Sequence, residues 1–433
     1  MSNHKYVLYQ RVYEEYKKKI VKKVYEPQQK LPSIRGAAKH YGVSTTTIEH
    51  AYQQLLIEGY IYSKPKRGYY VEDLKFMKIE RPLEPHKALH ENKPVNKRQH
   101  KDMFRLDRIR KIMNSVLTNN EKLYEDCLPT GEIELKVEIK KHLAKHRDVL
   151  LSHDQIIIAS GTQQLLMWLA PLFENNTRVA YLKPGFKRAI QALQILGFET
   201  YGVNSVDEMI DAKAKILFVS PSNLYPSGEV MPIKERLELI QYAQSQNAYI
   251  IEDDYNHIFR YNAYQIPPIH QLAEGQNVIY IGSFSMNTLL SIRMSYMGLP
   301  LDLAKALNRD TLAQTVSKID QLMMAQFLAS KDYEKHLRYL SRYSKKRNEA
   351  LQKALEPWMS SENFTISGLQ SNMHLLIHCQ KLSIKKQIIQ NLKKLNYAYT
   401  TFEEDKYLIL LPYRGIPKER FDSIFEKLFQ HIQ

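Results

Sequence analysis

The feature that most constrains the fold of this chain is a short apolar run at residues 278–281 and the turn that follows it. The run has the length and composition of a buried β-strand, and the turn reads Gly282-Ser283-Phe284-Ser285. Arg293 follows after about two further helical turns. Hydroxyl groups, backbone N–H groups and a guanidinium are donors that hold an anion such as phosphate. The sequence therefore predicts an anion site at the carboxyl end of a strand.

Composition argues against a membrane-embedded or disulfide-rich protein. The chain has 433 residues, enough for one large and one small domain, and its apolar fraction is 44%. No run approaches the roughly 18 apolar residues of a transmembrane helix. The first residues lack the apolar core of a signal peptide, so we expect a cytoplasmic protein. Cys127 and Cys379 have no metal-ligand or redox spacing, which predicts free thiols and no metal site.

The positive charge is concentrated in the N-terminal quarter. Residues 1–110 contain 24 Lys and Arg but only 12 Asp and Glu, so they carry +12 of the net charge of +16. The remaining 323 residues carry only +4. A basic segment on a nearly balanced body indicates a polyanion-binding module attached to a globular domain.

The basic segment has the pattern of a helix-turn-helix followed by a hairpin. Apolar residues recur at helical spacing over 9–24. Ser33 is a suitable N-cap for a short helix that Gly42 ends, and Ser44 is a suitable N-cap for a second helix. A basic turn then separates two predicted strands, at residues 59–62 and 69–71.

This order of residues resembles the winged helix-turn-helix of GntR-type transcription regulators. The resemblance rests on Leu-Pro-Ser-x-Arg at 31–35, Gly-Val-Ser at 42–44 and Gly-Tyr-Ile at 59–61. It implies a double-stranded DNA operator, which the second helix reads in the major groove. The implied DNA-binding residues are Ser33, Arg35, Ser44, Thr45, Thr46, Thr47, Lys66, Arg67 and Gly68. Thr45 stands where that family commonly has an arginine, so we expect the operator sequence to differ from those of family members that carry the arginine.

From residue 126 onward, strand-like apolar runs alternate with helix-length segments. This alternation predicts an α/β domain with a largely parallel sheet, in which ligands bind beyond the carboxyl ends of the strands. The predicted strands are residues 156–159, 179–182, 216–219, 249–252, 278–281 and 294–297.

Loops at the ends of these strands resemble those of fold-type-I pyridoxal-phosphate (PLP) enzymes, the class that includes aminotransferases. The matching segments are Ser-Gly-Thr at 160–162, Pro-Gly-Phe at 184–186, Pro-Ser-Asn-Leu-Tyr-Pro-Ser-Gly at 221–228, Glu-Asp-Asp-Tyr at 252–255 and Gly-Ser-Phe-Ser at 282–285. The resemblance implies that Asp253 pairs with the pyridine nitrogen and keeps it protonated, while Tyr255 contacts O3′. Ser283, Ser285 and Arg293 would hold the phosphate.

The other loops complete the implied cofactor site. Gly161 and Thr162 follow a strand and open a helix, which is the geometry of a phosphate cradle. The resemblance further implies that Phe186 stacks on the pyridine ring and that Tyr225 lines the O3′ side.

Together, the two sets of motifs resemble MocR-type regulators, in which a GntR winged helix is fused to an aminotransferase-like domain. The fold class this implies is multidomain, with a small α+β winged helix and a large α/β domain of fold type I. We expect a DNA-binding domain at 1–75, a basic linker at 76–110 and an effector and dimerisation domain at 111–433. The resemblance also implies a head-to-tail homodimer.

Several departures from the PLP pattern argue against transaminase activity. Met286 stands where that family has the lysine that binds PLP covalently, and a thioether cannot form an imine. Leu182 and Lys183 replace the usual acidic pair before Pro-Gly-Phe. Near the C-terminus, the strand that usually carries a carboxylate-binding arginine has none until Arg414. We therefore expect a sensing domain without catalysis.

The sequence leaves alternatives open. PLP either binds non-covalently through the residues named above or does not bind. In the second case the effector is a pyridoxine-like or unrelated small molecule, or the domain is a dimerisation scaffold without a ligand. The alternative function is an active PLP-dependent aminotransferase with a fused DNA-binding domain. It requires a lysine in place of Met286, and Lys183 and Lys187 are the candidates near Phe186. A general nucleic-acid-binding or structural protein would explain the charge but not the motifs.

Overall fold

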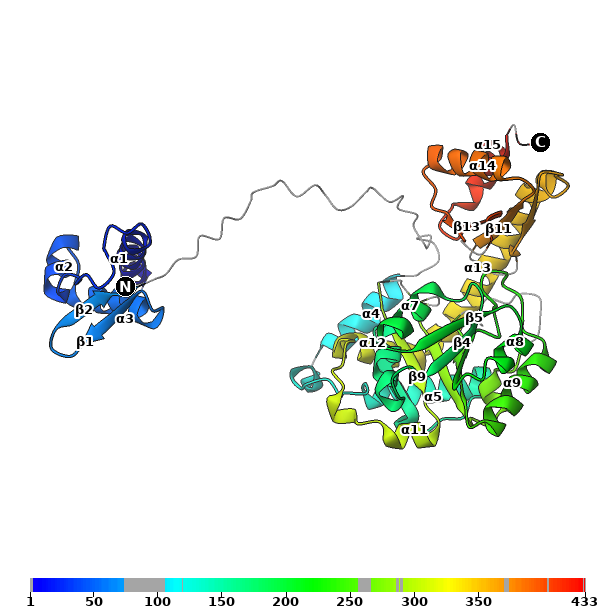
Figure 1. Cartoon of the computed structure of the whole chain (residues 1–433), viewed down its shortest axis with the longest axis horizontal. Helices are drawn as coiled ribbons and strands as arrows, with labels where there is room; N and C mark the ends of the chain where they lie inside the picture. The colour runs from blue at the N-terminus through cyan, green and yellow to red at the C-terminus, as the bar shows by residue number, and fades with distance from the viewer. Residues whose placement is uncertain are drawn as a thin grey trace. The chain divides into compact units, whose positions relative to one another are not determined.

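The computed structural model describes residues 3–73, 106–118, 120–255, 266–285, 288, 291–369, 374–402, 405–430 and 432. Contacts divide the chain into two units, Met1–Leu89 and His90–Gln433. Figure 1 labels their helices and strands. Within the described ranges, no helix is long and apolar enough to cross a membrane.

The N-terminal unit is a winged helix-turn-helix, as predicted. Its elements are α1 (Asn3–Val21), α2 (Ile34–Tyr41), α3 (Thr45–Ile57), β1 (Ile61–Lys64) and β2 (Gly68–Val71). Ser33 Oγ accepts from Gly36 N at 3.1 Å and begins α2, whereas Gly42 adopts a left-handed φ of 63° and ends it. Ser44 Oγ accepts from Thr47 N at 3.2 Å and begins α3. β1 and β2 pair antiparallel.

Buried aromatic rings fix the angle between these helices. Tyr16 of α1 and Tyr52 of α3 meet edge to face, with ring centroids 5.3 Å apart. The Tyr52 hydroxyl donates to the carbonyl of Pro32 at 3.0 Å, which ties α3 to the segment before α2. Burial of these rings with Val12, Ile48 and Leu55 gives the unit its own hydrophobic core.

The larger unit contains a seven-stranded sheet in the order β3-β9-β8-β7-β6-β4-β5. Its strands are β3 (Ile156–Ala159), β4 (Arg178–Leu182), β5 (Glu199–Val203), β6 (Ile216–Val219), β7 (Tyr249–Asp253), β8 (Val278–Ser283) and β9 (Ser295–Gly298). β4, β5, β6, β7 and β8 pair in parallel, and β9 runs antiparallel to β3 and β8. The predicted α/β fold is confirmed, and each predicted strand occurs within one residue or so of its expected position.

Helices cover both faces of this sheet (Figure 1). Strand residues alternate between the faces: Ile157 and Ala159 contribute to one core, and Ile156 and Ile158 to the other. The first core is covered by α6 (Thr162–Leu169), α7 (Lys187–Ile195) and α11 (Leu301–Ala306). The opposite face is covered by α5 (Ile133–Arg147), α8 (Val206–Asp211), α9 (Ile233–Ser245), α10 (Ile269–Leu272) and α12 (Lys318–Ala329). α4 (Leu106–Leu117) packs on α12.

The C-terminal part forms a second, antiparallel sheet that the sequence patterns did not predict. The long helix α13 (Lys331–Leu355) leads to it (Figure 1). Its order is β10-β11-β13-β12, with α14 and α15 packed on it. The bounds are β10 (Phe364–Ser367), β11 (His374–Cys379), α14 (Leu382–Lys394), β12 (Thr400–Thr401), β13 (Leu408–Pro412) and α15 (Phe421–Phe429). Arg347 of α13 is buried and donates to the carbonyls of Tyr413 and Ile416, which joins the helix to this sheet.

Candidate functional site

The predicted cofactor residues lie at one edge of the seven-stranded sheet. Asp253, at the end of β7, pairs with Ile281 of β8. Ser295, at the start of β9, pairs with both Ser283 of β8 and Ala159 of β3. The carboxyl ends of β3, β7 and β8 therefore meet there, which is where open α/β sheets bind ligands.

Gly161 and Arg293, far apart in sequence, are in direct contact at this edge. A Cβ atom built at Gly161 would lie 2.9 Å from Arg293 Nη2, and the Gly161 φ of 149° is one that other residues rarely adopt. Arg293 is exposed, and Thr162 is half-buried at the start of α6. The guanidinium thus lies beside the backbone that opens α6, and the two supply converging donors for an anion.

Ser283, the last residue of β8, and Ser285, in the turn after it, add hydroxyl groups. The two Oγ atoms are 3.2 Å apart, and Ser285 N donates to Ser283 Oγ at 3.2 Å. Both residues are half-buried. This turn follows β8, which pairs with β9. Arg293 lies two positions before Ser295, the first residue of β9. These serines and Arg293 thus come from adjoining segments at one sheet edge.

Asp253 is a buried carboxyl group at the end of β7. It is 4% exposed, and burial, followed by the negative charge of Asp254, raises its pKa to about 7. A cationic partner would hold it ionised, so the site suits a protonated ring nitrogen.

Tyr255 and the loop after β6 lie next to this carboxyl group. Asn223 Nδ2 donates to the Tyr255 hydroxyl at 2.9 Å. Burial, followed by the neighbouring carboxylate of Asp253, raises the pKa of Tyr255, so its phenol stays a neutral donor. Tyr225 packs against His374 and Phe402 of the C-terminal part, with ring centroids 5.8 and 6.3 Å away. Phe186 is 37% exposed just before α7, so its ring remains available for stacking.

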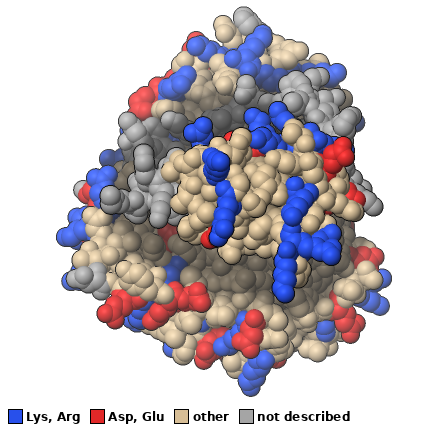
Figure 2. Space-filling model, turned by 90° about the vertical axis from the view of Figure 1, so that its left-hand side faces the viewer, with Lys and Arg blue, Asp and Glu red and all other residues tan. Residues whose placement is uncertain are grey.

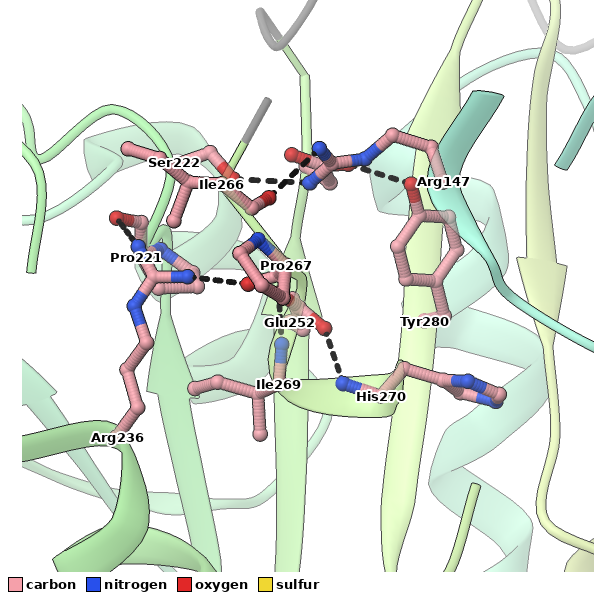
Figure 3. Close-up of polar contacts among 11 residues, drawn as sticks. Arg147, Pro221, Ser222, Arg236, Glu252, Ile266, Pro267, Ile269, His270 and Tyr280 are labelled. Carbon is pink, nitrogen blue, oxygen red and sulfur yellow. Dashed lines mark hydrogen bonds and ion pairs between the residues drawn. The ribbon is translucent and has the colours of Figure 1, made fainter. Parts of the chain in front are cut away.

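Beneath this edge lies a buried ion pair that sequence reasoning missed. Arg147, at the end of α5, donates from Nε to Asp254 Oδ2 at 2.8 Å, and the Tyr280 hydroxyl donates to the same oxygen at 2.5 Å (Figure 3). Arg147 also donates to Ser222 Oγ at 3.1 Å and to the Ile266 carbonyl at 2.9 Å. One guanidinium therefore holds α5, β7 and the loop after β6 together. The only sequence signal was the second Asp of Glu-Asp-Asp-Tyr.

Glu252 and Arg236 complete the buried polar layer. Glu252 accepts from the backbone N–H groups of Ile269 and His270, both at 2.8 Å (Figure 3). Arg236 is fully buried and donates to three backbone carbonyls, those of Met231, Pro221 and Pro267. These contacts fix the loops around the sheet edge rather than offer a ligand site.

Among the departures from the PLP pattern, Met286 lies outside the described residues. Arg414 is buried after β13. Lys183 lies against β5, because a Cβ atom at Gly202 would come within 2.9 Å of Lys183 Cε.

The predicted DNA-binding residues divide into exposed and structural groups. Thr45 and Thr46 are exposed at the start of α3, whereas Thr47 is buried and its hydroxyl lies 2.8 Å from Ser44 Oγ. Ser33 and Ser44 cap their helices. The remaining predicted contacts are exposed on α2 and the wing: Arg35, Lys66, Arg67 and Gly68. Figure 2 shows Lys and Arg side chains extending into solvent from the face that it draws.

Two protein-family models match this chain. The model of bacterial regulatory proteins of the gntR family matches residues 8–71. The model of aminotransferase class I and II matches residues 96–405.

Similar proteins agree with both matches. The uncharacterized HTH-type transcriptional regulator YdeL of Bacillus subtilis is 32% identical over 89% of this chain and 87% of its own length. The HTH-type pyridoxine biosynthesis transcriptional regulator PdxR of Corynebacterium glutamicum is 26% identical over 85% of this chain and 82% of its own. The multiple substrate aminotransferase of Thermococcus profundus shares the fold with a TM-score of 0.69 at 20% identity, covering 76% of this chain and 88% of its own.

Proposed function

Because the chain belongs to the HTH-type transcriptional regulators that join a gntR-family domain to an aminotransferase class I and II domain, we propose that its larger unit is a sensor rather than an enzyme. In this proposal the winged helix binds operator DNA, and the larger unit dimerises and binds a small anionic ligand of the PLP type non-covalently. The protein then needs no transaminase activity.

The observation that carries this proposal is the meeting of Gly161, Arg293, Ser283 and Asp253 at one sheet edge. The described residues fit the non-covalent part of PLP. Arg293 and the serines would hold its phosphate, and Asp253 would pair with its ring nitrogen. When bound, PLP supplies a ring that withdraws electrons from attached groups. The relative PdxR is named for pyridoxine biosynthesis, which supports a ligand of this chemistry.

The position of Lys183 supports a site without covalent attachment. In the order β7-β6-β4-β5, β5 lies on the far side of β4 from Asp253. Since Lys183 packs on Gly202 of β5, its amine is directed away from the proposed ring site. Lys187 is exposed in the first turn of α7. The placement of Lys183 against β5 disfavours the alternative of an active aminotransferase, which needs an amine at the ring site in place of Met286.

Exposed apolar residues support dimerisation of the larger unit. Tyr124 is 95% exposed, Leu117 52% and Ile133 50%, close together in sequence around the start of α5. Leu128 and Ile133 line a hollow on this surface. Exposed apolar residues that lie together mark protein–protein contacts, and Leu128 and Ile133 lie together in this way.

Operator binding is the direct test of the regulatory role. We expect the purified protein to bind a duplex from the upstream region of its own or a neighbouring gene about 1000-fold more tightly than a random duplex at physiological salt. Fluorescence anisotropy with labelled duplexes measures both affinities. Equal affinities for the two duplexes would refute the proposed regulatory function.

Substitution of Met286 tests the sensing site. We expect the native protein to bind PLP saturably but to release it on dialysis, since residue 286 offers no amine. The Met286→Lys variant should instead retain PLP, and borohydride reduction should add the mass of the cofactor to the chain. Mass spectrometry and absorption spectra give the readout. If native protein itself retains PLP after reduction, another lysine reacts and the aminotransferase alternative gains support.

A further inference from the structure

Helix α13 carries a row of cations that neither its packing nor the proposed ligand site uses. Arg338, Arg342, Lys345 and Lys346 are exposed, and their spacing of three and four residues places them on one side of the helix. The opposite side is buried and includes Tyr333, Leu340 and Leu351. We call these four residues the α13 basic stripe.

The stripe has no acidic partner among the residues that the structure describes. Other charges near it are paired: Lys335 lies 3.6 Å from Asp332, and Lys145 lies 2.7 Å from Glu334. No ion pair joins any stripe residue to a described carboxylate. Along this side of α13, Glu334 lies one turn before Arg338 and is paired with Lys145 and His146, and Glu349 is exposed one turn beyond Lys345. An unpaired row of this kind leaves a local positive potential.

The stripe also lacks the apolar residues of a protein interface. Between Leu301 and Met359, a stretch described throughout, there is no exposed large hydrophobic residue. Protein interfaces bury aromatic and aliphatic anchors and are depleted of lysine. The exposed side chains of the stripe therefore offer charge rather than apolar area, and a polyanion fits them better than an apolar protein surface.

We propose that the α13 basic stripe contacts the sugar-phosphate backbone of the DNA duplex that the winged helix binds. This inference rests on the proposed function, because it assumes a DNA ligand. From Arg338 to Lys346 the helix rises about 12 Å, and one strand of B-DNA presents about three phosphates over that length. The planar guanidinium groups of Arg338 and Arg342 bind phosphate with two hydrogen bonds each. Tyr339 and Tyr343, stacked at 6.1 Å beside the stripe, place further phenol groups nearby.

The salt dependence of DNA binding tests this contact. In the full-length protein, the stripe is neutralised by Arg338→Gln, Arg342→Gln, Lys345→Gln and Lys346→Gln. We expect the slope of log affinity against log salt to fall in magnitude by about 0.9 for each phosphate that the variant no longer neutralises, or roughly 3 in total. The decrease should appear on a long duplex with flanking DNA and should be similar on a random long duplex, because phosphate contacts carry no sequence information.

A control with the same change of charge is available on α14. Lys386, Lys393 and Lys394 are exposed on the helix and Lys381 is exposed at its N-cap, and four Lys→Gln changes there alter the net charge equally. We expect the slope of this variant to stay within about 1 of the wild-type slope.

Three outcomes would overturn the proposal. The first is an unchanged salt slope in the α13 variant, and the second is an equal decrease of the slope in the α14 variant. The third is a changed oligomeric mass of the α13 variant with an unchanged slope, which would assign the stripe to a protein partner. Failure of operator preference in the wild-type protein would refute the regulatory function instead. The slope comparison on random DNA remains informative in that case, so the two failures are distinguishable.

Discussion

Replacement of Arg147 by methionine should lower the free energy of unfolding of the larger unit by about 3–5 kcal/mol, the cost of breaking a buried ion pair. Arg147 and Asp254 have side chains that are 2% and 0% exposed. Without the guanidinium, Asp254 Oδ2 would keep the hydrogen bond from the Tyr280 hydroxyl but lose its ion pair in a region of low dielectric. Burial opposes the charged form of Arg147, but Asp254, Tyr280 and Glu252 together outweigh it and raise the pKa of Arg147.

Urea unfolding followed by tryptophan fluorescence measures this destabilisation. The chain has two tryptophans, Trp168 and Trp358, and both lie in the larger unit. Arg178→Met is a suitable control, because the Arg178–Glu199 pair is about half exposed and should contribute at most about 1 kcal/mol. The double variant Arg147→Met with Asp254→Leu should recover part of the stability, since no buried charge remains. Equal stability of Arg147→Met and the wild-type protein would contradict this account.

Replacement of Arg293 by glutamine should weaken PLP binding by about 10- to 100-fold, the typical value of one charge-assisted hydrogen-bonding group. The guanidinium of Arg293 lies against the Gly161 backbone, so its positive charge contacts the proposed phosphate cradle. Glutamine keeps hydrogen-bond donors but removes the charge. Since Arg293 is exposed, the folded state should lose little stability.

Titration of PLP monitored by its absorption, alongside pyridoxal without the phosphate, gives this effect a specific signature. The native protein should prefer PLP over pyridoxal, and Arg293→Gln should lose most of that preference. Arg178→Gln removes another exposed charge, at the amino end of β4 and away from the carboxyl edge of the sheet, and should leave both affinities unchanged. If Arg293→Gln retains the native preference, the phosphate is held elsewhere.

Elements with strong local signals were predictable from the sequence. Ser33 and Ser44 cap their helices because a side-chain oxygen satisfies backbone N–H groups only three residues away. Gly42 ends α2 because glycine adopts a left-handed conformation without steric cost. The strand at 278–281 was evident from its buried apolar composition, which the interior of a parallel sheet requires.

Contacts between distant residues were not predictable in this way. Arg147 and Asp254 are separated by 107 positions, and a lysine- and histidine-rich helix end gave no sign that its arginine is buried. The antiparallel sheet of the C-terminal part was not predicted, because its strands are not followed by loops that resemble cofactor-binding loops. The α13 basic stripe became visible only when the opposite side of the helix was found to be buried.

The sequence by itself determined the two-unit organisation, six of the seven strands of the larger sheet (all but β5) and the types of residue at its carboxyl edge, because these depend on local composition and periodicity. The tertiary structure decided which of these residues meet. It brought Gly161 against Arg293, buried Asp253 above the Arg147–Asp254 pair, and turned Lys183 toward β5. Burial and charge pairing act through space, so the chemistry of this edge depends on the order of the strands in the sheet and not on their order in the chain.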